Sequence, residues 1–184
     1  MNPEPIAGKL RKHNAFPLLS NKQIEQADTA QVFEPGQIVA VRNSGNWSLA
    51  MYVQLDNSGC SQGECLITNY ATLEQFSLAK SGTADGKNPS LRGIAAATIA
   101  SQKFGWAYIW GYVEKADTSQ TAASGEMLCI SGSVAGKMTS DAASSVLNST
   151  IGTVSQMTIP FAIAVARAAF ATGVGSVSIL GMWG

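Results

Sequence analysis

The sequence has few charged residues. Asp, Glu, Lys and Arg make up 13% of its 184 residues and cancel to a formal net charge of +0. This share is about half that of an ordinary soluble domain, which is typical of a protein that buries much of its surface against partners. Binding to phosphates needs an excess of Lys and Arg, so we expect no nucleic-acid partner. No apolar run approaches the length of a membrane span, and the N-terminus lacks the apolar core of a signal peptide.

Cysteine is also scarce, with three in the chain: Cys60, Cys65 and Cys129. This number suits a reducing compartment better than a disulfide framework, although the spacing leaves a Cys60–Cys65 bridge across a loop open. The two residues lack the spacing and the further ligands of a zinc site. The segment DNSGCSQGE, residues 56–64, offers oxygen donors but not the regular spacing of a calcium loop. We therefore expect no metal.

Candidate catalytic groups are few. The only histidine is His13, and no second strong base is at hand to complete a Ser–His–Asp or Cys–His set. The acidic residues are scattered, so nothing pairs two carboxylates for acid–base chemistry. The segment GSVAGKM, residues 132–138, is one residue short of a phosphate loop, and Met138 stands where Ser or Thr would ligate magnesium. We expect a hairpin there, no cofactor and no enzymatic activity.

The first 33 residues differ in composition from the rest. They mix Pro, Asn, Lys, Arg and Gln with isolated apolar residues. Only SNKQIEQADTA has helical character, with Ser20 as the N-cap. Such a segment cannot bury enough apolar surface by itself. We interpret residues 1–33 as an N-terminal arm that is disordered or orders against a partner, and residues 34–184 as one β-domain.

From residue 37 the hydrophobic period becomes two. Residues 36–56 form two alternating runs around the turn NSGN, a hairpin signal that places on one face Trp47, Leu49, Met51, Val53 and Leu55. Further short runs, punctuated by 18 glycines, predict an all-β barrel or sandwich with one or two short helices. We interpret the Ala-rich IPFAIAVARAAFA as a strand because its large residues alternate, and SDAASSVLNS as a short helix.

Two stretches are loosely alike without forming a strict repeat. They are residues 93–109 and residues 161–179. Each combines a strand of small residues, a turn and an alternating strand.

Aromatic residues concentrate in QKFGWAYIWGYVEKAD, residues 102–117. A strand would place on one face the alternating Phe104, Trp106, Tyr108, Trp110 and Tyr112. Such a stripe can be buried in the core or against a sister subunit, or it can stack against sugar rings. We favour burial, because Trp and Tyr carry polar tips that suit a partly buried interface. The small residues on the opposite face would let another backbone approach closely.

The order of three segments resembles the C-terminal half of small phage head proteins: GIAAATIASQKFGWAYIWGYVEKA, ASGEMLCISGSVAGKMTS and IPFAIAVARAAFATGVGSVSILG. Over residues 92–182 the chain resembles bacteriophage capsid decoration (cement) proteins, and PGQIVAV, residues 35–41, resembles their opening strand. The positions that fit are Gly93, Gly105, Trp106, Gly111, Gly125, Gly136 and Lys137. The five glycines are expected at structural turns, and Glu126 stands where an Asp is commoner.

The resemblance implies a small β-barrel protein of the virion, made in the host cytoplasm, that binds the outer capsid surface without enzymatic activity. Its expected partners are the major capsid protein and further copies of itself, as a homotrimer, with no nucleic acid or membrane bound. It would cement neighbouring capsid subunits against the pressure of packaged DNA. We expect the arm to supply capsid contacts through Lys9, Leu10, Arg11, Lys12, Phe16, Leu18 and Leu19.

Three alternatives stay open. A head-fibre or tail-fibre module for host recognition would bind cell-surface polysaccharide through exposed aromatics. A small hydrolase would need carboxylate chemistry that the sequence does not assemble. A neck or tail-completion protein would share the fold class but occur in few copies per particle.

Overall fold

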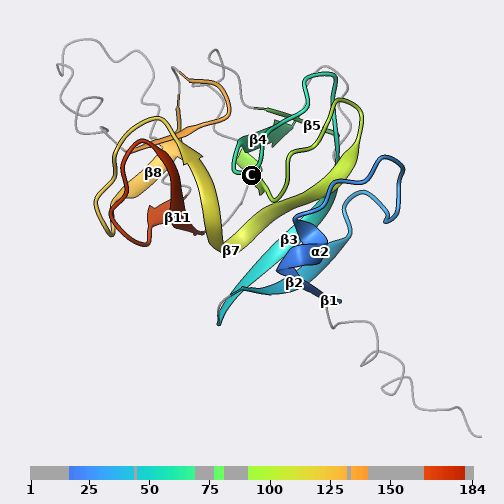
Figure 1. The fold of residues 1–184 in the computed structure, drawn as a ribbon, viewed down its shortest axis with the longest axis horizontal. Coiled ribbons are helices and arrows are strands. Elements are labelled where there is room, and N and C mark those ends of the chain that lie inside the picture. The colour runs from blue at the N-terminus through green and yellow to red at the C-terminus, as the bar shows by residue number, and fades with distance from the viewer. Residues whose placement is uncertain are drawn as a thin grey trace, which may run out of the picture.

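The computed structural model describes residues 17–43, 45–68, 77–80, 91–131, 134–140 and 164–180. It has an all-β fold (Figure 1), and the one short helix in these residues is α2 (Asn21–Ile24). The strands are β1 (Leu18–Ser20), β2 (Ile38–Asn43), β3 (Asn46–Leu55), β4 (Cys65–Thr68), β5 (Ser77–Lys80), β6 (Leu91–Ala95), β7 (Phe104–Thr118), β8 (Met127–Ile130), β9 (Met138–Ser140), β10 (Ala164–Ala166) and β11 (Gly173–Ile179).

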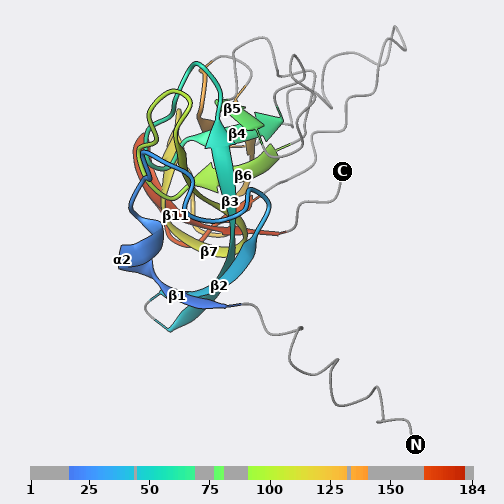
Figure 2. The same cartoon turned by 90° about the vertical axis from the view of Figure 1, so that its right-hand side faces the viewer.

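In the described part of the chain, 11 strands form one sheet that two additional pairings close into two rings. The first ring runs through β3, β5, β4, β6 and β7, and the pairing of β3 with β7 closes it. The second ring runs through β7, β11, β10, β8 and β9, and the pairing of β9 with β7 closes it. Strands β1 and β2 extend the sheet from β3 at one end of the molecule (Figure 2). The predicted all-β barrel is therefore confirmed, with β7 shared between two rings.

The two rings repeat one pairing scheme. In each, the first strand along the chain pairs in parallel with the third, as β3 does with β5 and β7 with β9. The other neighbours are antiparallel, and their registers match: Cys65 faces Ile94 in the first ring as Met127 faces Val165 in the second. Strand β7 thus ends one unit and begins the next. The described parts of the two loosely similar stretches are equivalent parts of this repeated unit.

A matching turn precedes the second strand of each unit. The Glu64 carboxylate accepts a hydrogen bond from the Ser61 N–H at 2.7 Å, and the Glu126 carboxylate accepts one from the Ala123 N–H at 2.7 Å. The residue directly before each turn forms a backbone bridge at an equivalent place, Cys60–Ile99 in the first ring and Ala122–Phe170 in the second. The G-E sequence is therefore a turn signal in both units, because its carboxylate satisfies a backbone N–H of the turn.

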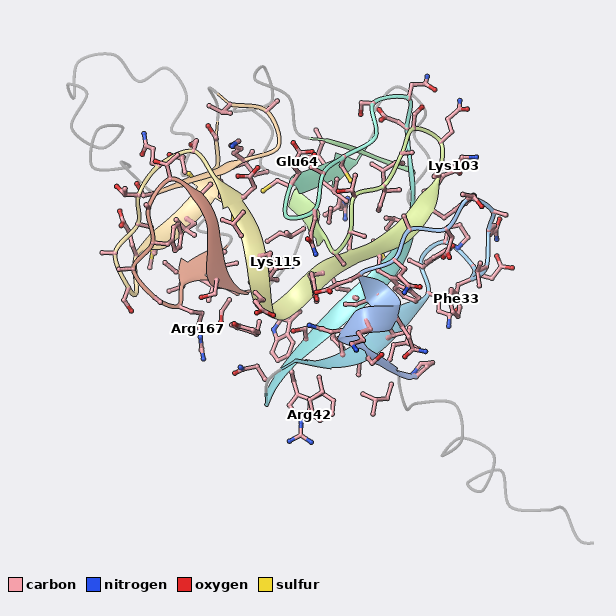
Figure 3. The ribbon with its side chains drawn as sticks, viewed as in Figure 1. Phe33, Arg42, Glu64, Lys103, Lys115 and Arg167 are labelled. Atoms are coloured by element: carbon pink, nitrogen blue, oxygen red, sulfur yellow. The ribbon has the colours of Figure 1, made fainter. Side chains whose placement is uncertain are left out.

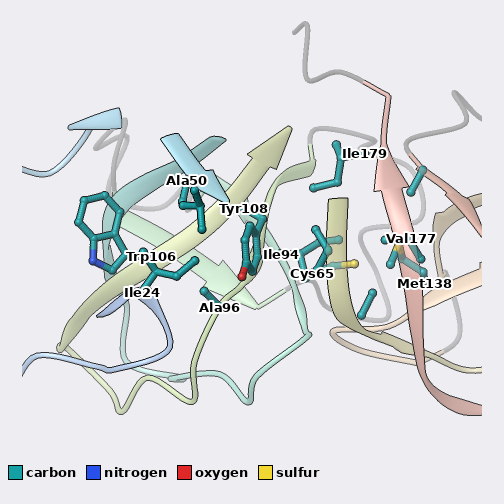
Figure 4. Close-up of a cluster of buried hydrophobic side chains, with 14 of the residues drawn as sticks. Ile24, Ala50, Cys65, Ile94, Ala96, Trp106, Tyr108, Met138, Val177 and Ile179 are labelled. Carbon is teal, nitrogen blue, oxygen red and sulfur yellow. The ribbon is translucent and has the colours of Figure 1, made fainter. Parts of the chain in front are cut away.

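Buried side chains form two clusters on opposite faces of β7. One cluster fills the first ring and consists of Val53, Leu55, Cys60, Leu66, Ala95, Ile99 and Ala107. The other runs from the exterior of the first ring into the interior of the second, as Figure 4 shows from Trp106 and Ile24 to Met138 and Val177. The faces differ because neighbouring residues of a strand point to opposite sides.

Two irregularities bend β7, which crosses the centre of the molecule (Figure 1). Opposite β3, the register passes from Trp110 to Tyr108 over one extra residue, Ile109. A second register shift lies opposite β11. Such β-bulges bend a strand and increase its twist. They allow one strand to leave the first ring and enter the second.

Several local predictions can be compared with the structure. The hairpin around NSGN is confirmed by β2 and β3, and the hairpin at AGK by β8 and β9. The strand expected within IPFAIAVARAAFA is present as β10. Ser20 is the N-cap of α2, which is shorter than the helical pattern suggested. The helix expected at SDAASSVLNS, residues 140–149, lies outside the described residues except for Ser140, the last residue of β9.

The expected turn role is wrong for three of the five glycines. Gly125 and Gly136 lie in turns, but the other three lie inside β6 and β7. A Cβ at Gly93 would lie 2.8 Å from the Cβ of Ala107, and one at Gly105 would lie 2.6 Å from Ile99 Cδ1. These positions are glycine because another element approaches closely, not because the chain turns.

Candidate functional site

The segment before β2 packs against the exterior of the first ring. Strand β1 pairs in parallel with β2, and Ile24 of α2 is fully buried in the larger cluster. The Phe33 ring contacts two aromatic rings, with centroids 5.3 Å from Tyr52 and 5.1 Å from Trp106. Residues 18–33, which the composition assigns to the arm, therefore cover the sheet.

Polar contacts fasten this cover. The Tyr52 hydroxyl donates to Asp28 Oδ2 at 2.8 Å, and the Tyr108 hydroxyl donates to Asn21 Oδ1 at 3.3 Å. Burial, together with the Asp28 carboxylate, raises the pKa of Tyr52 to about 12. Burial also raises the pKa of Tyr108. Both phenols are neutral donors at physiological pH, as these hydrogen bonds require.

The residues that we expected to contact the capsid are only partly described. Leu18 is 63% exposed on β1, whereas Leu19 packs against the larger cluster. The other members, Lys9, Leu10, Arg11, Lys12 and Phe16, lie outside the described residues.

The aromatic stripe does not occupy one face of one strand, so that prediction is wrong. Trp106 and Tyr108 are buried in the larger cluster, but the bulge at Ile109 reverses the alternation and leaves Trp110 47% exposed. Gly111 makes the reversal feasible, because its φ is +86° and a Cβ there would collide with the Trp47 carbonyl oxygen.

An apolar strip crosses the sheet at the place where the two rings join. Its first row runs across β1, β2, β3 and β7 through Leu18, Ala40, Leu49 and Trp110. Its second row runs across β7, β11, β10 and β8 through Tyr112, Ser178, Val165 and Met127. The rows meet on β7, where Trp110 and Tyr112 are two residues apart and share a face.

The strip exposes large side chains along its whole length. Besides Leu18 and Trp110, it contains Met127, which is 54% exposed, and Trp47 beside it is 51% exposed. None of the positions in the two rows carries a charge. Neighbouring strands lie about 4.8 Å apart, so the two rows trace about 30 Å along the sheet, and the second row curves with the closed second ring. Contiguous exposed apolar surface of this kind marks interaction sites on soluble proteins.

The side chains that could carry out chemistry have structural roles in the described residues. Cys60 and Cys65 are buried thiols rather than a disulfide, and burial raises the pKa of Cys65. Lys137 of the AGK turn forms an ion pair with Asp117 at 3.2 Å. Within the described ranges, no group of His, Cys, Asp and Glu could hold a metal ion. Among the same residues, no helix has both the length and the apolar character to cross a membrane.

The sequence contained part of the signal for the strip. The hairpin pattern placed Trp47 and Leu49 on one face, but the reversal at Trp110 depends on a bulge that the even alternation of aromatics conceals. Comparison of the sequence with protein-family models and with curated proteins finds no match.

Proposed function

We propose that the chain is a non-enzymatic virion structural protein that binds the outer surface of a phage capsid and cements neighbouring major capsid subunits. The observation that carries this proposal is the apolar strip, in which Trp110 and Met127 are exposed on the closed rings and Leu18 is exposed on β1, which extends the sheet beside them. A closed sheet presents such a surface with little loss of conformational entropy on binding. Adhesion by a rigid surface is also consistent with the low charge of the chain.

The affinity would come from additive burial. A few hundred Å² of apolar contact at about 25 cal/mol/Å² contributes several kcal/mol before the costs of association. A single copy would therefore bind weakly. A homotrimer would bind as one multivalent unit and dissociate far more slowly.

The direct test is binding to capsid shells that lack this protein. Replacing Trp110 by Ser should weaken binding by at least tenfold, because an exposed aromatic anchor of an interface is lost. The matched control is Val174→Ser, since Val174 is also exposed but lies outside the strip. Wild-type affinity of the Trp110 variant would contradict the role of the strip. In intact particles, quantitative mass spectrometry should find hundreds of copies, whereas a neck or tail-completion protein would show few.

The arm can be tested separately if the truncation respects the fold. Removing residues 1–16 leaves the buried Ile24 and the ring contacts of Phe33 in place. If the arm reaches a neighbouring capsid subunit, this truncation should keep the fold and reduce shell occupancy. Occupancy at the level of the full chain would remove the arm from the mechanism.

The second candidate is a host-recognition module that binds cell-surface polysaccharide. The exposed indoles of Trp47 and Trp110 favour it, because sugar rings stack on such surfaces. Binding of the chain to purified host polysaccharide, with no binding to shells, would favour this function over the first.

A further inference from the structure

Two arginines accompany the apolar strip, each placed over an aromatic ring. The Arg42 guanidinium carbon lies 5.7 Å from the centroid of Trp47, and that of Arg167 lies 5.9 Å from the centroid of Tyr112. Both side chains are exposed, and Figure 3 shows them pointing toward the same side of the molecule. Stacking on a ring holds a guanidinium in place while its N–H edge stays available to a partner.

Nearby charges do not neutralise these arginines. Among the described residues, neither forms an ion pair, and the acidic Asp117 is engaged with Lys137. Glu114, two residues beyond Tyr112 on β7, is exposed and has an interaction partner of its own. The strip is therefore neutral and apolar along its rows, and the two stacked arginines lie beside it.

The first ring shows what covers an equivalent surface. The row equivalent to the second row of the strip is Ala50, Tyr108, Ile94 and Cys65, and all four are buried. Residues of the segment 18–33 lie in the same cluster, and that segment contributes a carboxylate, Asp28, to the Tyr52 hydroxyl. Of the row, Tyr108 contacts this segment through the Asn21 side chain, and the Asp28 carboxylate lies beside the row at Tyr52, two residues from Ala50 on β3.

We propose that the apolar strip binds a different protein whose apolar contact surface carries carboxylates, which pair with Arg42 and Arg167. A second copy of this chain fits poorly, because two strips placed face to face would bring arginines of like charge together. This inference rests on the proposed function and specifies its partner as an acidic-rimmed apolar surface of the shell. The indoles provide affinity, and the arginines provide orientation and rate of association.

The test measures binding of the full chain to capsid shells that lack it, over a range of sodium chloride concentrations. Arg42→Glu and Arg167→Glu should each weaken binding at low salt by about tenfold and flatten its salt dependence, because steering by opposite charge is lost. Lys22→Glu is the matched control, since it makes the same charge change at an exposed position of α2, away from the strip. It should bind within about twofold of wild type, as should Arg167→Lys at low salt.

The outcomes separate this inference from the proposed function. If Trp110→Ser loses binding while both arginine variants keep wild-type affinity and salt dependence, the acidic partner is wrong and the proposed function stands. If the wild-type chain does not bind shells, both proposals fall. If analytical ultracentrifugation shows a dimer that Trp110→Ser abolishes, the strip belongs to a second copy and the inference is overturned.

Discussion

The two rings share a pairing scheme but differ in what covers them. In the first ring, the exterior row through Tyr108, Ile94 and Cys65 is buried. In the second ring, the equivalent row through Ser178, Val165 and Met127 is at least partly open to solvent. The segment 18–33 contacts Tyr108 of this row through Asn21, whereas Cys65 lies against the second unit, where its N–H donates to the Gly136 carbonyl oxygen. Equivalent exterior positions of the two rings therefore differ in burial although their strand pairing is the same.

The turns of the two units repeat this contrast. Gly63 and Gly125 have φ values of +88° and +83°, so both need the same left-handed conformation. A Cβ at Gly63 would lie 2.9 Å from the Lys115 carbonyl oxygen, whereas one at Gly125 would meet nothing within 4 Å. The second half of β7 packs on the turn of the first unit, and in the described residues nothing takes that place for the second.

The largest expected effect on the free energy of unfolding comes from comparing equivalent positions of β7 and β11. Trp106 and Ser176 accept matching backbone hydrogen bonds, from Ala96 and Arg167 respectively. Trp106→Ala should lower the free energy of unfolding by about 3–5 kcal/mol, because a buried indole is removed. Ser176→Ala should change it by less than about 0.5 kcal/mol. Urea denaturation measures both, and equal losses would show that the cover does not distinguish the rings.

The next largest effect is the difference in destabilisation between alanine variants of the two turn glycines, Gly63 and Gly125. Alanine at either position should cost about 1–2 kcal/mol, because an L-residue is strained at positive φ. Gly63→Ala should cost about 1–3 kcal/mol more than Gly125→Ala, since its new methyl group meets the backbone of β7. Thermal and urea unfolding of the two variants give the difference. Equal destabilisation would mean that the turn and β7 separate at little cost.

The smallest effect is a pH dependence expected from the cover of the first ring. The pKa of Tyr52 is raised from 10.0 in an unfolded chain to about 12 in the folded protein. Between these values the unfolded state binds fewer protons, so the stabilisation present below pH 10 is lost as the pH rises toward 12. Tyr52→Phe should be less stable at neutral pH and should lose less stability between pH 10 and 11. Urea midpoints at pH 8, 10 and 11 measure this, and parallel losses in both proteins would contradict it.

Much of the fold could be predicted from local patterns. Alternating apolar residues from Ile38 to Leu55, interrupted at residues 43–46, specify a hairpin because only that register buries one face. In the sequence the repeated unit is only a loose likeness, because equivalent positions carry different residue types, Trp106 against Ser176 and Tyr108 against Ser178. The equivalence of Trp106 and Ser176 emerges from backbone hydrogen bonds rather than from residue type.

The sequence by itself determined the strands, their turns and the apolar character of β7, since alternation and glycine placement act over a few residues. The tertiary structure decided which aromatics are buried. Trp110 faces solvent because β3 and β7 pair with an extra residue at Ile109, and Trp106 is buried because Phe33, far away in the chain, packs on it. Both outcomes depend on contacts between distant segments, which no local pattern encodes.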